Sequence, residues 1–77
     1  MTTLGRMTAG ARGRVCGLIG TGPFAQRLAE VGLIPGVEVT VVRFAPLGDP
    51  MQVRVRNGHL ALRRAEAEGI NVLPIPG

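Results

Sequence analysis

The clearest pattern of hydrophobic and polar positions lies between residues 51 and 62, where it predicts a β-hairpin. Apolar residues occupy alternate positions from Met51 to Val55, which indicates a strand with one buried face. The dipeptide Asn57-Gly58 favours a two-residue type I′ turn. That turn predicts the pairs Arg56 with His59, Val55 with Leu60, Arg54 with Ala61 and Val53 with Leu62, which bring the apolar side chains to one face.

Residues 37–44 predict a second strand, because β-branched residues dominate them. Valines at positions 37, 39 and 41 fall on one face, and Phe44 falls on the opposite face together with Val42. Both faces are partly apolar, so we expect one to line the core and a helix to cover part of the other. Residues 14–19 predict a first strand. Residues 70–73 predict a closing strand that Pro74 and Pro76 end.

An amphipathic helix is predicted between the first strand and residues 37–44. Thr21-Gly22-Pro23 opens it, with Pro23 suited to the first helical turn, and Gly32 ends it. Pro35-Gly36 then fits the centre of a type II turn. The apolar face is Phe24, Leu28 and Val31, and the solvent face is Gln26, Arg27 and Glu30.

These elements predict an all-β, SH3-like small barrel of about five strands. A short helix follows the first strand, and one helical turn over residues 64–68 precedes the last. The 77 residues form a single domain, residues 1–77, with a core over about residues 8–75. An OB-fold is the alternative five-stranded barrel, but it usually needs longer strands.

The charge balance is positive, at +4 from nine arginines with no lysine. Arg43, Arg54, Arg56 and Arg63 fall on the outer sheet face, where such charges are most often a solvated surface; as a binding surface, this basic patch would favour an acidic protein partner. Phe24 and Phe44 are the only aromatic residues, too few for the stacking platforms of a single-strand binder, so no nucleic-acid partner is expected.

The location expected for the chain is the cytosol. It has one cysteine and hence no internal disulfide, which suits a reducing compartment. The first ten residues lack the apolar segment of a signal peptide, and the apolar runs are too short to span a bilayer.

The residues that could carry chemistry are few. There is no serine and no phosphate-binding loop, so no catalytic residue and no nucleotide site is predicted. His59 and Cys16 are the only soft or borderline metal ligands besides three methionines, and a structural zinc site needs four ligands. We interpret His59 as a surface strand histidine and Cys16 as a small strand residue. A site shared between two chains stays open.

The segment Ala45–Pro50, APLGDP, predicts a stiff loop. Pro46 fixes φ, Gly48 supplies a positive φ, and Asp49 can bond nearby backbone amides. Leu47 then stands exposed at the tip of a rigid loop, where it would lose little entropy on binding a partner. The alternative interpretation is that the residues of this loop serve only to form the turn and bind no partner.

Five segments of the chain resemble the FeoA family in order and spacing. They are RVCGL at 14–18, RLAEVGLIPGVEV at 27–39, VVRFAPLGDP at 41–50, HLALRR at 59–64 and INV at 70–72. The resemblance implies an SH3-like fold and a cytoplasmic role with FeoB, the membrane ferrous iron transporter with a cytosolic GTP-binding domain. The resemblance implies no catalytic residue in this chain. Because family members often bind transition metals, weak Fe(II) or another divalent transition metal stays open, although no cofactor is expected.

The hypothesis from the sequence is a non-enzymatic, cytoplasmic accessory or regulatory protein of ferrous iron uptake that docks on FeoB. The alternative is a small transition-metal-binding or metal-responsive protein with a site shared between chains, and a homo-oligomer is compatible with both. A GTPase-modulating factor would depend on Arg27, whose simpler role is to pair with Glu30 at i+3. The predicted partner-binding residues are Arg27, Leu33, Pro35, Pro46, Leu47, Gly48 and Asp49.

Overall fold

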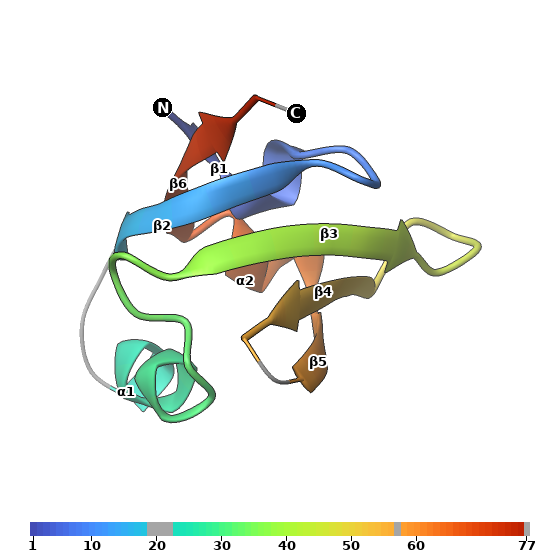
Figure 1. The fold of residues 1–77 in the computed structure, drawn as a ribbon. Helices are drawn as coiled ribbons and strands as arrows, with labels where there is room; N and C mark the ends of the chain where they lie inside the picture. Colours follow the sequence, from blue (N-terminus) through green and yellow to red (C-terminus); the bar gives the residue numbers. More distant parts are fainter. Residues whose placement is uncertain (19–22, 57, 77) are drawn as a thin grey trace.

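The computed structural model describes residues 1–18, 23–56 and 58–76 (Figure 1). The elements follow the order β1 (Thr2–Thr3), the 3₁₀ helix η1 (Leu4–Arg6), β2 (Arg12–Leu18), α1 (Pro23–Glu30), β3 (Glu38–Phe44), β4 (Met51–Val55), β5 (Gly58–Leu62), α2 (Arg64–Ala67) and β6 (Ile70–Ile75). The predicted Ile19 and the predicted helix start at Thr21-Gly22 lie outside the described residues.

The strands form one antiparallel sheet in the order β1-β6-β2-β3-β4-β5. The sheet curves around a single core, with β2 and β3 in front and α2 behind them in Figure 1. Among the described residues, no helix is both long enough and apolar enough to cross a membrane. The buried apolar side chains are Leu4, Met7, Val15, Leu28, Leu33, Val37, Val39, Val41, Met51, Val53, Val55, Leu62, Ala67, Ile70 and Val72.

The turn between α1 and β3 confirms the prediction from its glycines. Gly32 has a φ of +97°, and the Leu33 amide donates to the Leu28 carbonyl at 2.9 Å, which ends the helix in a left-handed cap. Gly36 has a φ of +95°, and the Val37 amide donates to the Ile34 carbonyl at 3.2 Å, as in a type II turn. Val31 is 45% exposed, so its predicted place on the buried helix face is wrong, because the helix already ends at Glu30.

A β-bulge overturns the predicted facing of Phe44. Val41 lies opposite Val53, but the next pair is Arg43 with Gln52, so Val42 is an extra residue in β3. The extra residue reverses the alternation beyond it. Phe44 therefore packs against the core beside buried Met51, and Arg43 points outward.

The β4–β5 hairpin forms, but its register differs from the prediction by two residues. Val55 pairs with Gly58, Arg54 with His59, Val53 with Leu60 and Met51 with Leu62. Because the shift is even, every side chain keeps its predicted face. The observed register sets buried Met51 opposite buried Leu62. The predicted turn residue Asn57 lies outside the described residues, while Arg56 has a φ of +33°.

Both ends of the chain take a larger part in the fold than the sequence predicts. Thr2 and Thr3 pair with Val72 and Asn71, and Leu4 is fully buried, so the core begins before residue 8. Strand β6 also continues through Pro74, which pairs with Gly13 of β2. Proline is tolerated there because β1 covers only residues 71 and 72, which leaves Pro74 without a described strand on its other side.

Candidate partner-binding surface

The loop of residues 45–50 joins β3 to β4 and extends away from the barrel (Figure 1). The Gly48 amide donates to the Ala45 carbonyl at 2.7 Å, and the Ala45 amide donates to the Pro50 carbonyl at 3.0 Å. Gly48 has a φ of +87°, which a side chain would strain. Leu47 at the tip is 97% exposed. The loop is therefore a hydrogen-bonded turn that exposes the apolar side chain of Leu47 to solvent.

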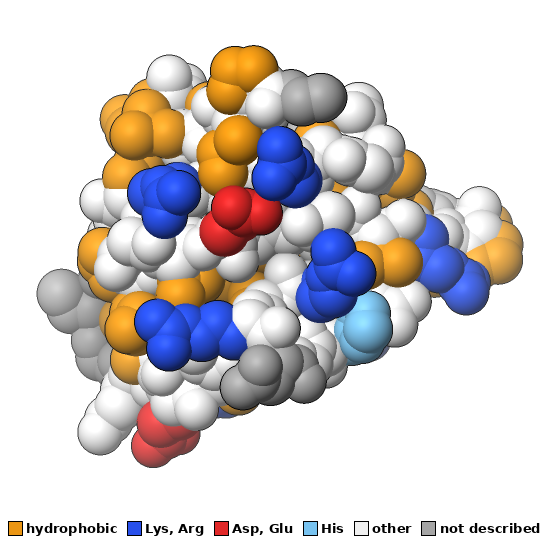
Figure 2. Space-filling view, viewed as in Figure 1, with side chains coloured by type: hydrophobic (Ala, Val, Ile, Leu, Met, Phe, Trp, Pro, Cys, Tyr) orange, Lys and Arg blue, Asp and Glu red, His pale blue; other side chains and the backbone are white. Residues whose placement is uncertain are grey.

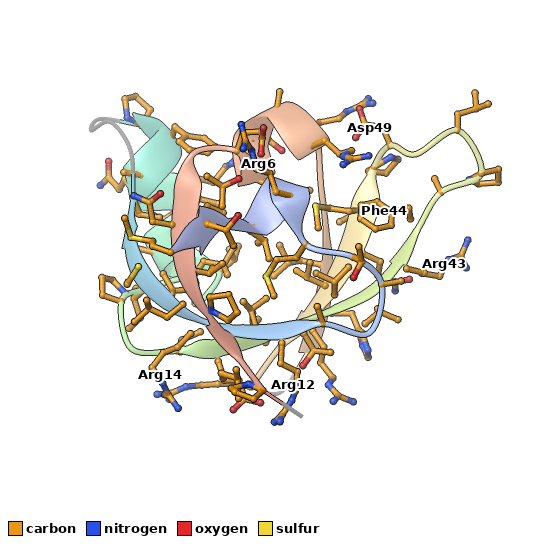
Figure 3. The ribbon with its side chains drawn as sticks, turned by 90° about the horizontal axis from the view of Figure 1, so that it is seen from above. Arg6, Arg12, Arg14, Arg43, Phe44 and Asp49 are labelled. Carbon is orange, nitrogen blue, oxygen red and sulfur yellow. The ribbon has the colours of Figure 1, made fainter. Side chains whose placement is uncertain are left out.

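Helix α2 fixes the base of this loop through Asp49 (Figure 3). The Asp49 Oδ1 atom accepts a hydrogen bond from the Arg64 amide at 3.0 Å, and Oδ2 lies 3.9 Å from the Arg63 guanidinium. The sequence predicts that Asp49 bonds nearby backbone amides, but the amide that it bonds belongs to Arg64, 15 residues further along the chain. Asp49 thus caps a helix from outside that helix, and the cap ties the loop to the body of the barrel.

The Arg64 side chain contacts both the end of β3 and the 3₁₀ helix η1. Its guanidinium carbon lies 5.0 Å from the centroid of the Phe44 ring, within range of a cation–π contact. Its side chain also donates to the Gly5 carbonyl at 3.1 Å. The end of β3, helix α2 and η1 are therefore joined at the foot of the loop.

Arg27 links the two helices. Its guanidinium forms an ion pair with Glu66 of α2, and the other Glu66 oxygen accepts from the Arg63 amide at 3.0 Å. The predicted pairing of Arg27 with Glu30 is wrong in this structure, because α1 packs with Arg27 toward α2. The Arg27 side chain is still 60% exposed. Sequence reasoning did not predict the pairing of Glu66 with Arg27, although a glutamate three residues after a helix N-cap has the spacing of a capping box.

A groove runs between α1 and β5, with apolar walls and a charged rim. Its lining includes Arg27 and Pro50, so the helix and the end of the loop meet at one surface. Leu47 stands beyond the groove and is not part of its lining. The groove residues are Arg27, Leu28, Val31, Pro50, Leu60, Ala61, Leu62, Arg63 and Glu66.

The predicted partner-binding residues separate into four places. Pro46, Leu47, Gly48 and Asp49 form the loop, and Arg27 lies at the groove beside the loop's end. Leu33 is fully buried, so its assignment to a partner surface is wrong: the left-handed cap at the end of α1 turns its side chain into the core. Pro35 is exposed but precedes β3, whose seven residues separate it from the loop by roughly 20 Å.

The two weak metal candidates are not brought together. Cys16 and His59 are both exposed, on β2 and β5, with β3 and β4 between those strands in the sheet. The Cys16 sulfur lies 3.4 Å from the Met1 sulfur. Within the described part of the chain, no three His, Cys, Asp or Glu side chains gather in a way that could hold a metal ion.

Comparison with known proteins adds the family to this geometry. The family described as "FeoA domain" matches residues 2–74. A fusion protein of Porphyromonas gingivalis, named Fe(2+) transport protein A/Fe(2+) transporter FeoB, is 42% identical over 53 residues. The match covers 69% of this chain, which spans only 6% of that protein's length.

Solved structures agree with the family match and with the barrel. The FeoA protein of Chlorobium tepidum superposes with a TM-score of 0.91 at 39% identity, covering 99% of this chain and 72% of the other. The Stenotrophomonas maltophilia FeoA complexed with zinc, described as an SH3 domain protein, gives a TM-score of 0.82 at 30% identity, covering 94% and 89%. The SH3-like fold is thereby confirmed. The chain belongs to the FeoA family, which is associated with ferrous iron transport.

Proposed function

We propose that this chain is a non-enzymatic, cytoplasmic accessory protein of ferrous iron uptake that docks on the cytosolic part of FeoB. The observation that carries the proposal is the relative in which a transport protein A and FeoB form one polypeptide. Fusion keeps two domains at high effective concentration, which benefits partners that must meet repeatedly. A transport protein A that is not fused to FeoB would need a surface that replaces the covalent link.

The loop of residues 45–50 supports such a surface. Leu47 is almost completely exposed at the tip of this loop, so its side chain is available to a partner. The turn hydrogen bonds and the Asp49 cap hold it in place before binding, so docking would cost little conformational entropy. In this arrangement Leu47 is the apolar anchor, and Arg27 at the groove is a polar contact at the rim.

The test compares Leu47→Ala with the matched control Leu73→Ala, a leucine 49% exposed on β6. Association with detergent-solubilised FeoB is measured by biolayer interferometry. Loss of a buried interface anchor often costs ~2 kcal/mol or more, so Leu47→Ala should weaken binding roughly tenfold or more. Its melting temperature should stay close to that of the original chain, because an exposed side chain changes stability by about 0.5 kcal/mol at most.

Two results would contradict this assignment. If Leu47→Ala unfolds the protein, the loop is core structure and not a docking element. If Leu47→Ala folds and binds FeoB as tightly as Leu73→Ala does, the docking surface lies elsewhere.

A second candidate function is transition-metal binding at a site shared between chains. Two observations favour it: Cys16 and His59 are both exposed, and a relative is described as complexed with zinc. Two copies of each side chain would supply the four ligands that zinc prefers. Sedimentation velocity with and without Zn(II) tests it, with a metal-dependent dimer that Cys16→Ala and His59→Ala each abolish as the supporting result.

A further inference from the structure

The outer face of the sheet carries a row of arginines that the strand register brings together. Arg12 lies opposite Thr40 of β3, Thr40 lies opposite Arg54 of β4, and Arg54 lies opposite His59 of β5. Arg14 lies next to this row, opposite Glu38. The β3 bulge adds Arg43, which pairs with Gln52 and faces outward. We call the surface of Arg12, Arg14, Arg43, Arg54 and Arg56, with Glu38 among them, the arginine face.

The arginine face holds the whole net charge of the chain. It has five of the nine arginines and one of the five carboxylates, which gives +4 and equals the formal charge of the chain. On the rest of the molecule, four arginines are balanced by four carboxylates, Glu30, Asp49, Glu66 and Glu68. Figure 2 looks onto this face and shows arginine side chains spread across it, with one acidic side chain in their midst.

Most arginines of this face have no carboxylate partner. Arg12 pairs with Glu38 at 3.2 Å, and Arg14 donates to the Gly36 carbonyl at 2.9 Å. For Arg43, Arg54 and Arg56, the described residues provide no carboxylate within 4.0 Å. Elsewhere, Arg6, Arg27 and Arg63 each have a carboxylate neighbour, and Arg64, the exception, donates to the Gly5 carbonyl and lies over the Phe44 ring. The unpaired guanidinium groups are therefore concentrated on one face.

We propose that the arginine face binds the anionic headgroups of a phospholipid bilayer. Guanidinium groups bind phosphate through two parallel hydrogen bonds and are weakly hydrated. The charges are spread over three strands, and a hollow among them is lined by Gly36, Val37, Glu38, Thr40, Arg54 and Arg56. Charges spread over several strands match a layer of headgroups better than they match a single peptide.

Two further features of this face favour lipid. Leu73 lies opposite Arg14 and is 49% exposed, so an apolar side chain stands among the arginines, where it would meet the headgroup–acyl boundary. Neither phenylalanine offers a stacking surface here: Phe24 is on α1, and both rings are partly buried against the core. Nucleic-acid bases would therefore find no aromatic platform.

Arg12 and Arg14 of the arginine face are separate from the loop assigned to FeoB, whereas Arg43 lines a hollow together with Ala45 and Pro50 at the base of that loop. In Figure 3, Arg12 and Arg14 extend from one side of the barrel, and Asp49 lies on the other. The domain could thus lie on a membrane surface through the arginines and still present Leu47. The lipid proposal does not depend on the proposed function, and either can fail alone.

The test is co-sedimentation with vesicles of phosphatidylcholine alone or with about 30% phosphatidylglycerol, at about 0.1 M salt. The chain should bind the anionic vesicles and not the neutral ones. Arg54→Gln/Arg56→Gln should weaken the partition coefficient about 30-fold, which corresponds to ~1 kcal/mol for each arginine near an anionic surface. Adding about 10 mM phosphate, a small addition to the ionic strength of about 0.1 M salt, should change binding little, since free phosphate cannot engage several arginines at once.

The matched control is Arg6→Gln/Arg63→Gln, which removes the same charge from the balanced side, at two exposed arginines 3.8 Å and 3.9 Å from their carboxylates. It should bind vesicles within a few-fold of the original chain, as should Leu47→Ala. Equal losses in both double variants would mean that only net charge matters and would overturn the assignment to this face. Binding to FeoB that needs Arg54 and Arg56, without vesicle binding, would assign the face to an acidic protein and overturn the lipid proposal.

Discussion

Replacing Asp49 with alanine tests whether helix α2 holds the exposed loop in place. The change removes the 3.0 Å hydrogen bond between the Asp49 carboxylate and the Arg64 amide, and with it the long contact to Arg63 at 3.9 Å. Loss of an N-cap costs typically ~1 kcal/mol, within a range of about 0.5–2. The ion pair adds little, because the Asp49 and Arg63 side chains are 42% and 71% exposed.

The expected effect of Asp49→Ala is therefore a loss of about 1 kcal/mol in the free energy of unfolding. For a domain of this size that lowers the melting temperature by roughly 4–8 °C. Urea titration followed by circular dichroism gives the free energy, and a thermal scan gives the melting temperature. Asp49→Asn keeps an oxygen that can accept from the Arg64 amide, so it should lose clearly less than alanine does.

The control is Glu30→Ala, which removes an exposed carboxylate on α1 that has no ion pair among the described residues. It should change stability by about 0.5 kcal/mol at most. Asp49→Ala should also weaken FeoB binding, because a freed loop must be ordered again on docking. Equal stability of Asp49→Ala and Glu30→Ala, or equal losses for asparagine and alanine at position 49, would refute the capping role.

Two other predictions concern the core and metal binding. Leu33→Ala should lose ~2–5 kcal/mol, as buried leucines do, whereas its 42%-exposed neighbour Ile34→Ala should lose much less; comparable urea midpoints for the two would show that Leu33 is not a core residue. The monomer should show no submicromolar, stoichiometric Fe(II) site in anaerobic calorimetry, since Cys16 and His59 stand on separate strands; such a site would favour the metal-binding alternative.

The local parts of the fold could be predicted because their signals lie within a few residues. Alternation over Met51–Val55 places the right side chains in the core, and Gly32 and Gly36 mark the two turns that need a positive φ. The even hairpin shift shows why facing is more robust than register: period-two alternation constrains the face, and several turn positions satisfy it equally.

What the sequence could not predict depends on distant partners. The bulge at Val42 that turns Phe44 inward exists only in relation to the pairing with β4. The ion pair between Arg27 and Glu66 joins residues 39 apart, and no local pattern indicates it. The burial of Leu33 follows from the direction in which the chain leaves α1, which depends on the packing of that helix on the sheet.

The candidate site also has parts that could be predicted from the sequence and parts that could not. The loop tip could be predicted, because Pro46 and Gly48 bracket Leu47 with residues that restrict or require particular backbone angles. The support beneath the loop could not, because it comes from Asp49 capping a helix that is remote in sequence. The arginine face was only partly predicted: Arg43, Arg54 and Arg56 belong to it, whereas Arg63 pairs with Asp49 beside α2.

The most direct measurement is the binding of this purified chain to full-length FeoB from the same organism, reconstituted in nanodiscs of neutral lipid to exclude the arginine face. Biolayer interferometry, with and without GTP, should show saturable binding that Leu47→Ala weakens roughly tenfold or more. Absence of saturable binding in both nucleotide conditions, with a folded chain and an active transporter, would contradict the proposed docking role.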